Sequence, residues 1–333
     1  MRFLPSSLSL TLLLAAWSAH ADVPTPPLTS GAAAQALFAQ WFVPQSAKAS
    51  ASATQLQALL QQYCAGQTSL EQVRAQFTQA SQDWETLSAL AMGAQIERRT
   101  ARMVDFQPPR PALLKSALRK APKDLAAMET IGAPAKGFPT AEHLLWVDVA
   151  QPHTPTCHYT TLVAADIAQE LQALHQANQA ASQFTTLDFD STGEFLNQWI
   201  GGVERLRWAS MEKPLRSATA DKPAQVTRTA SQGTVASWQA QWKALRHLAV
   251  GDATQSPQVS IASLVEAQGW ERLANEVRQS VQAVDAAMQG ITQVDLASIT
   301  PATKALSQLK HLVENDVALA LDVTIGFSDA DGD

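Results

Sequence analysis

The segment from residue 136 to residue 146, K-G-F-P-T-A-E-H-L-L-W, combines a carboxylate with the residue types that begin a helix. Gly137 allows a break in the backbone, and Pro139 suits the first turn of a helix, where a missing N–H group has no partner to lose. Glu142 follows one turn later, where the helix dipole favours a negative charge. The segment therefore predicts a well-formed helix start with the Glu142 carboxylate in it.

A lone carboxylate is a weak binding site, so any site at Glu142 needs other groups to converge on it. Asp105 and Glu194 are acids that the fold can bring toward it, although a surface position or an ion pair is the commoner role for such residues. Arginines beside a buried glutamate offer a different chemistry, because they either form structural ion pairs or hold an anionic ligand with paired hydrogen bonds. The basic candidates are Arg99, Arg102, Arg110, Lys213 and Arg216.

A second group of possible ligands consists of His153, Cys157 and His158, residue types that bind zinc or copper. Pro152 and Pro155 place this group in a predicted loop. If Cys157 is part of a disulfide, its thiolate is unavailable and only two histidines remain.

Four common catalytic signatures do not occur in the sequence. These are the zinc-binding H-E-x-x-H, the nucleophile elbow G-x-S-x-G, the phosphate-binding G-x-x-x-x-G-K and the dinucleotide-binding G-x-G-x-x-G. The sequence therefore gives no direct support to the enzyme classes that these motifs define.

Long stretches rich in Ala, Gln and Leu position the candidate residues, and this composition favours helices. Apolar residues recur along these stretches at steps of three, four or seven, which predicts amphipathic helices. The series are Leu70, Val73, Phe77, Trp84 and Leu87; Val163, Ile167, Leu171 and Leu174; Leu196, Trp199, Val203 and Leu206; Val235, Trp238, Trp242 and Leu245; and Leu306, Leu309, Val313 and Val317. Since no convincing alternating strand is present, the predicted fold class is all-α.

A turn-rich zone from Thr185 to Gly193 separates two groups of predicted helices. A polar loop near residues 217–233 interrupts the second group. We therefore predict two helical bundles that meet near residue 190: residues 22–188, which carry the Glu142 segment, and residues 189–333.

The first 21 residues have the three parts of a secretory signal peptide: Arg2, an apolar run from Leu8 to Trp17, and small residues at Ala19 and Ala21. We expect cleavage after Ala21 and export to the periplasm. No later segment is apolar enough over about 20 residues to span a bilayer. The full sequence has 24 basic and 30 acidic residues, a net charge of -6. Loss of Arg2 makes the mature chain more acidic still, so nucleic acid is not an expected partner.

The sequence contains two cysteines, Cys64 and Cys157. Export would place both in a compartment where disulfides persist, which favours a bond between them. The alternative is two separately buried thiols, which pack as small apolar side chains.

The segment around Glu142 resembles the signature of the imelysin-like family of bacterial periplasmic and envelope proteins, G-x-H-x-x-E followed by an apolar run. Gly137 and Glu142 match this signature, and L-L-W at 144–146 matches the apolar run. Pro139 stands where the metal-binding type of the family has histidine. His143 cannot replace that histidine, because it points about 100° away from Glu142 around a helix.

The resemblance extends over nearly the whole mature chain, to the branch of the family with proline in the motif. The other matching positions are Arg98, Arg99, Arg102, the segment 105–111 (D-F-Q-P-P-R-P), Cys157, Asn197, Gly201, Gly202, Glu212, Lys213, Pro214, Arg216, Gly326, Phe327, Asp331, Gly332 and Asp333. The resemblance implies two helical bundles with the motif near their junction. It also implies a link to iron uptake, a transition metal held by the histidine and glutamate of the motif, and the peptidase activity for which the family was named.

Three functional hypotheses follow. The first is a non-catalytic periplasmic protein of iron or other metal acquisition, which binds a metal, a metal complex or an envelope partner at the junction around Glu142. The second is a metallopeptidase of the imelysin type, which Pro139 weakens. The third is a partner-binding scaffold in which the motif is purely structural. The candidate site consists of Gly137, Pro139, Glu142, Asp105, Arg110, Lys213 and Arg216, with Glu142 as the candidate metal ligand.

Overall fold

A computed structural model describes residues 30–183, 191–252 and 259–326. The predicted signal peptide, the stretch from Thr185 to Asp190 and the acidic end of the chain lie outside the described residues. Within these residues the regular structure is helical, apart from one isolated bridge between Thr219 and Lys222. The all-α prediction is therefore confirmed.

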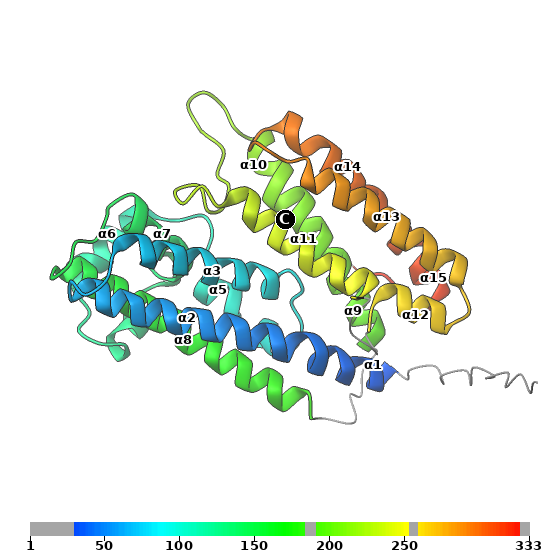
Figure 1. The fold of residues 1–333 in the computed structure, drawn as a ribbon, viewed down its shortest axis with the longest axis horizontal. Helices are drawn as coiled ribbons and strands as arrows, with labels where there is room; N and C mark the ends of the chain where they lie inside the picture. Colours follow the sequence, from blue (N-terminus) through cyan, green and yellow to red (C-terminus); the bar gives the residue numbers. More distant parts are fainter. Residues whose placement is uncertain (1–29, 184–190, 253–258, 327–333) are drawn as a thin grey trace, which may run out of the picture.

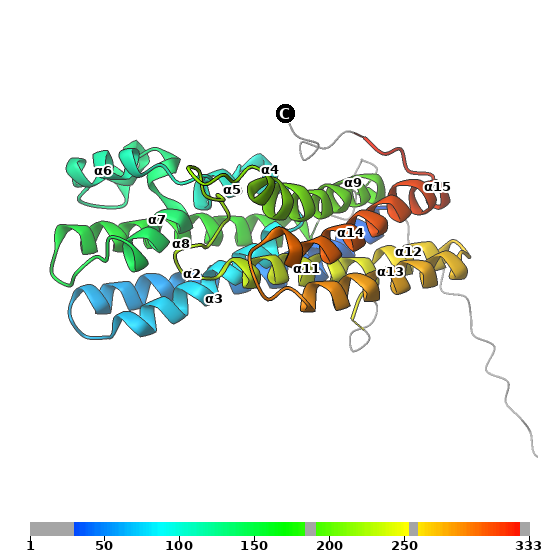
Figure 2. The ribbon, with the colours of Figure 1, turned by 90° about the horizontal axis from the view of Figure 1, so that it is seen from above.

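The first group of helices is built around a long pair that packs side by side, α2 and α8, with α3 against α2 and α7 against α8 (Figure 1). A short first helix runs through a π-helical turn into α2, and three short helices lie on the opposite side of α8 from α2 and α3 (Figure 2). The bounds are α1 Ser30–Leu37, η1 Phe38–Phe42, α2 Val43–Cys64, α3 Leu70–Ser88, α4 Ala94–Glu97, α5 Thr100–Val104, α6 Pro111–Lys120, η2 Ala126–Thr130, η3 Ala133–Ala135, α7 Gly137–Trp146 and α8 Pro155–Ala181.

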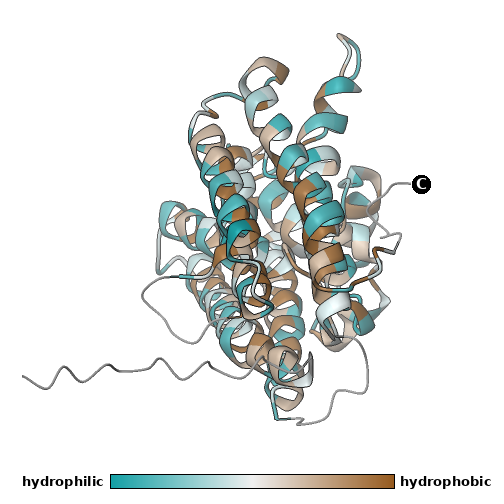
Figure 3. Ribbon diagram, turned by 90° about the vertical axis from the view of Figure 1, so that its right-hand side faces the viewer, coloured by the Kyte–Doolittle hydropathy of each residue, from teal (hydrophilic) through white to brown (hydrophobic). Residues whose placement is uncertain are grey.

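The second group packs α11, α13 and α14 together, with α14 also against the rod formed by α9 and its π-helical continuation η4. The bounds are α9 Ser191–Glu204, η4 Arg205–Glu212, α10 Lys213–Arg216, α11 Thr234–Val250, α12 Ile261–Ala267, α13 Glu271–Gln289, α14 Leu296–Leu312, η5 Val313–Val317 and α15 Ala318–Ala320. Hydrophilic and hydrophobic residues both occur along the helices seen in Figure 3, as expected for helices that bury one face and expose the other. No helix in the described ranges is long and apolar enough to cross a membrane.

The two groups meet mainly where α11 packs on α3 and α1 packs on α9. Gly202 of α9 approaches the backbone of the first group so closely that a Cβ atom there would lie 2.4 Å from the carbonyl oxygen of Ala89. The Arg205 side chain donates a hydrogen bond to the same oxygen, at 3.2 Å. Trp41 stacks on His247 of α11, with ring centroids 5.0 Å apart. These contacts hold the two groups together. The Glu142 segment lies at the same junction, against the loop that precedes α11.

The tryptophans of the predicted apolar stripes lie in the core. Trp84, Trp199 and Trp238 are almost completely buried, and Trp242 is 4% exposed. The indole N–H of Trp199 donates to the carbonyl oxygen of Leu245, 2.8 Å away. The stripes therefore mark helix packing in both groups.

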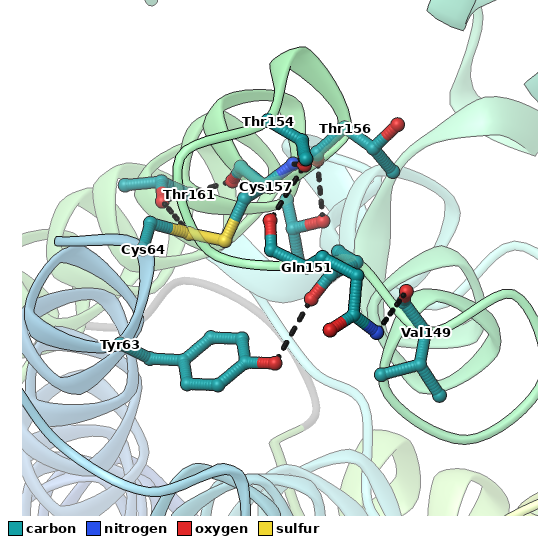
Figure 4. Close-up of a disulfide and its surroundings, with 10 residues drawn as sticks. Tyr63, Cys64, Val149, Gln151, Thr154, Thr156, Cys157 and Thr161 are labelled. Carbon is teal, nitrogen blue, oxygen red and sulfur yellow. Dashed lines mark hydrogen bonds between the residues drawn. A yellow bond between two sulfur atoms is a disulfide. The ribbon is translucent and has the colours of Figure 1, made fainter. Parts of the chain in front are cut away.

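A disulfide joins Cys64, the last residue of α2, to Cys157 in the first turn of α8 (Figure 4). The predicted bond is confirmed, and it removes Cys157 from the possible zinc or copper ligands. The prediction of a loop was wrong for Cys157 and His158, which lie in the first turn of α8. The helix begins earlier than expected, because Pro155 takes its first position and Thr154 caps it. His158 contacts the carbonyl oxygen of Lys123 at 3.1 Å.

Candidate functional site

Helix α7 begins at Gly137, as predicted, with Pro139 as a buried third residue. Gly137 has a φ of +73°, and a Cβ atom there would lie 2.3 Å from the carbonyl oxygen of Val104. Only glycine satisfies both conditions. The start of α7 therefore packs on the end of α5 and brings Asp105, the residue after α5, to the same place.

The residues just before α7 are tied to α8. The buried Lys136 Nζ lies 3.1 Å from Asp166 Oδ1, and the Tyr159 hydroxyl donates to the carbonyl oxygen of Ala135 at 2.6 Å. Burial raises the pKa of Asp166 although Lys136 opposes the shift, and burial also raises the pKa of Tyr159. These contacts fix the direction in which α7 leaves the turn.

The Glu142 carboxylate points across the junction to the loop that precedes α11. Its Oε1 atom accepts hydrogen bonds from the backbone N–H and from the hydroxyl of Ser231, at 2.8 and 2.6 Å. Glu142 is 7% exposed, so both bonds are shielded from water. The motif glutamate therefore fastens the loop of the second group to the first group.

Arg228, three residues before Ser231, forms the charged centre of the junction. Its guanidinium donates two hydrogen bonds to Asp105, Nη1 to Oδ1 at 3.1 Å and Nη2 to Oδ2 at 2.7 Å. Nη2 also lies 3.1 Å from Glu85 Oε1, as an ion pair without the alignment of a hydrogen bond. The guanidinium carbon lies 5.3 Å from the ring centroid of Phe138, and Arg228 is 2% exposed. One buried cation thus pairs with an acid of α3, Glu85, and with an acid that follows α5, Asp105.

The other partners of the two acids complete the centre. The Trp84 indole N–H donates to Asp105 Oδ2 at 3.1 Å, and the Gln241 amide donates to Glu85 Oε2 at 2.7 Å. Burial disfavours the charge of Arg228, but Asp105 and then Glu85 outweigh it, so its pKa lies above the ordinary value. Burial is also the largest influence on Glu85 and raises its pKa, although Arg228 opposes the shift. The attraction of Arg228 therefore does not fully offset the burial of Glu85.

Glu85 gives the centre a testable pH dependence. Its pKa in the folded chain is raised above the ordinary 4.5, so its stabilising contribution is complete below that value and is lost as the pH rises through the raised pKa. Glu85→Gln keeps an acceptor for Gln241 and cannot ionise. We expect the unfolding free energy of the variant to rise relative to that of the unchanged protein as the pH increases from below 4.5 through the raised pKa. Urea titrations across this range measure the difference, and a constant or falling difference would contradict the assignment.

The structure brings together only part of the predicted site. Gly137, Pro139, Glu142 and Asp105 lie at one junction. Arg110 is exposed and lies over the Phe106 ring, 5.7 Å from its centroid.

The two basic candidates of the second group lie elsewhere. Lys213 is exposed in α10, and Arg216 pairs with Glu212 at 3.0 Å. Glu212 also pairs with Arg207, so Arg216 belongs to an ion-pair network within the second group. Burial, and then the charge of Glu97, raise the pKa of Glu194 at the start of α9. None of these residues is an observed partner of Glu142 in the part of the chain that the structure describes.

Sequence reasoning missed three residues of the centre: Glu85, Arg228 and Ser231. Glu85 had a usable signal, because it lies beside Trp84 on the buried side of a helix where a charged residue is unusual. Arg228 and Ser231 had none, since they lie in a polar loop without periodicity.

The family resemblance implied a metal held by a histidine and a glutamate, and the residues present do not fit such a site. Pro139 offers no ligand atom, and Glu142 Oε1 already accepts two hydrogen bonds. Among the residues described there is no group of three or more His, Cys, Asp or Glu side chains that could hold a metal ion. The positive charge among Glu85, Asp105 and Glu142 comes from the Arg228 guanidinium.

The sequence pattern of the Imelysin family matches residues 43–318, and a search of curated proteins finds no match. Two solved structures share the fold. An imelysin-like protein from Psychrobacter arcticum 273-4 superposes with a TM-score of 0.75 at 15% identity, over 91% of this chain and 100% of that one. A proposed iron-regulated protein A precursor from Parabacteroides distasonis ATCC 8503 gives a TM-score of 0.75 at 13% identity, over 90% of this chain and 97% of that one. Because the family pattern covers most of its length, the chain belongs to the Imelysin family.

Proposed function

We propose that this protein is a non-catalytic binding protein of the bacterial envelope that takes part in acquiring iron or another metal. In this proposal it recognises a metal complex or an envelope partner at the junction, and it does not hold a bare ion through its motif. The observation that carries the proposal is the engagement of the motif carboxylate: Glu142 Oε1 accepts both hydrogen bonds from Ser231. Because the Glu142 carboxylate is hydrogen-bonded to the loop of the second group, we assign it the role of joining the two groups of helices.

The iron-related part of the proposal rests on the family and on its relative. The Parabacteroides distasonis protein is described as iron-regulated, and it shares the fold over 90% of this chain. We further propose export by cleavage after Ala21, a periplasmic location, and a division into bundles of residues 22–188 and 189–333. The Cys64–Cys157 disulfide is consistent with an oxidising compartment.

A metallopeptidase would need a different centre. Catalytic zinc sites keep three protein ligands and one open position for water. At Glu142 the neighbouring groups are the Ser231 donors and the Arg228 cation, and neither serine nor arginine is among the usual ligands of a catalytic zinc ion. This donor set favours the binding protein over the peptidase.

Metal analysis of the mature chain, residues 22–333, tests the proposal after equilibration with Fe²⁺, Fe³⁺ or Zn²⁺ and removal of free metal. We expect far less than one ion per chain, with no difference between the unchanged protein, Glu142→Ala and the control Glu129→Ala. Glu129 is a suitable control because it is an exposed glutamate of the same bundle. About one ion per chain, lost only in Glu142→Ala, would contradict the proposal and would direct the next assay to peptide hydrolysis.

A further inference from the structure

The segment from Arg98 to Lys123 has a charge unlike that of the rest of the protein. It contains eight of the chain's 24 basic residues and one of its 30 acidic residues. That single acid, Asp105, is already bonded to Arg228. An acidic protein therefore has one strongly basic segment.

The basic side chains of this segment are exposed, and seven of the eight are unneutralised. Only Arg98 forms an ion pair, with Glu170. The others are exposed and have no ion-pair partner among the described residues. They are Arg99, Arg102, Arg110, Lys115, Arg119, Lys120 and Lys123. Self-repulsion among such charges is relieved when an anionic surface covers them.

The basic segment forms a layer on one side of the molecule. Helices α5 and α6 of this segment lie in a row with α4, which precedes the segment and ends in the exposed acid Glu97, beside α8 and on the side away from α2 and α3 (Figure 2). Helix α6 is peripheral and packs mainly on the short turn η3, so its outer face has no covering element among the described residues. The cations of the segment therefore belong to elements of one layer of the molecule.

Large apolar side chains are also exposed within this segment or next to it. Ile96 is 46% exposed, Leu113 is 45% exposed and Met103 is 36% exposed. Basic residues interspersed with exposed apolar residues on a short amphipathic helix are typical of segments that lie in a lipid–water interface.

We propose that the layer α4–α6 is a peripheral docking surface for an anionic phospholipid bilayer. Lys115, Arg119 and Lys120 of α6 lie at the phosphate groups, and Leu113, which shares a helix face with Lys120, enters the interface. The inference is independent of what Glu142 binds. It gives the protein an orientation at a membrane without a spanning helix.

Co-sedimentation with vesicles of phosphatidylglycerol and phosphatidylcholine tests the proposal, using the mature chain at low salt. We expect binding that grows with the phosphatidylglycerol fraction and weakens at high salt. The triple variant Lys115→Gln, Arg119→Gln, Lys120→Gln should bind more weakly by on the order of 100-fold, since each basic residue near such a surface contributes about a factor of five.

The matched control is Lys222→Gln, Lys243→Gln, Lys304→Gln, which removes the same charge from exposed lysines of the second group. It should bind almost as the unchanged protein does. Leu113→Gln should weaken binding several-fold at both salt concentrations.

Three outcomes would overturn the proposal. The first is no binding to phosphatidylglycerol vesicles, and the second is equal loss in the two triple variants. The third is binding of soluble poly-glutamate without binding of vesicles, which would assign the surface to an acidic protein.

Discussion

Arg228→Met is expected to lower the free energy of unfolding by about 3–5 kcal/mol, because it leaves buried carboxylates without their cation. Glu85 and Asp105 both pair with this guanidinium, and the side chains of both acids are largely buried. Urea denaturation measures the loss. Part of it should be recovered at low pH, where Glu85, whose pKa is raised by burial, is protonated and no longer needs the cation.

The control for Arg228→Met is Arg246→Met. Arg246 also pairs with an aspartate, Asp285, but it is 44% exposed. Exposed pairs contribute about 1 kcal/mol or less. If the two variants lost the same free energy, Arg228 would not be the centre of the junction.

Gly137→Ala is expected to cost about 3 kcal/mol or more, because it combines backbone strain with a collision. The φ of +73° is unfavourable for alanine, and the new Cβ would lie 2.3 Å from the carbonyl oxygen of Val104. Relief requires α7 to move away from the end of α5, which would also disturb Asp105. Thermal or urea unfolding of the purified variant measures the effect.

Gly269→Ala separates the two causes. Gly269 has a φ of +80°, but nothing lies within 4 Å of the position of its Cβ. Its substitution should cost only the conformational strain, about 1–2 kcal/mol. Equal losses in the two variants would show that the close packing of α7 on Val104 adds nothing.

The sequence predicted the helices well because their cause is local. The stripe through Phe77, Trp84 and Leu87 is visible in the sequence, and it forms the buried face of α3. The start of α7 was also predictable, since Gly137 and Pro139 act within one turn. Local rules therefore located the segment that carries Glu142.

The partners of Glu142 could not be predicted in the same way. Ser231 is 89 residues away in the sequence, and Arg228 is 123 residues from Asp105. Their loop has no hydrophobic period, so its position depends on how the two helical groups dock. Residue type alone favoured Arg110 and Arg216, although Arg110 is exposed and Arg216 pairs with Glu212.

Amide hydrogen exchange at Ser231 tests most directly the claim that the motif glutamate joins the two groups. The account predicts that this amide is protected in the unchanged protein, because Glu142 accepts its N–H at 2.8 Å in a buried setting. In Glu142→Ala its protection should fall toward that of an open loop, while the amides of α13 keep theirs. Fast exchange at Ser231 in the unchanged protein, or equal protection in Glu142→Ala, would contradict the claim.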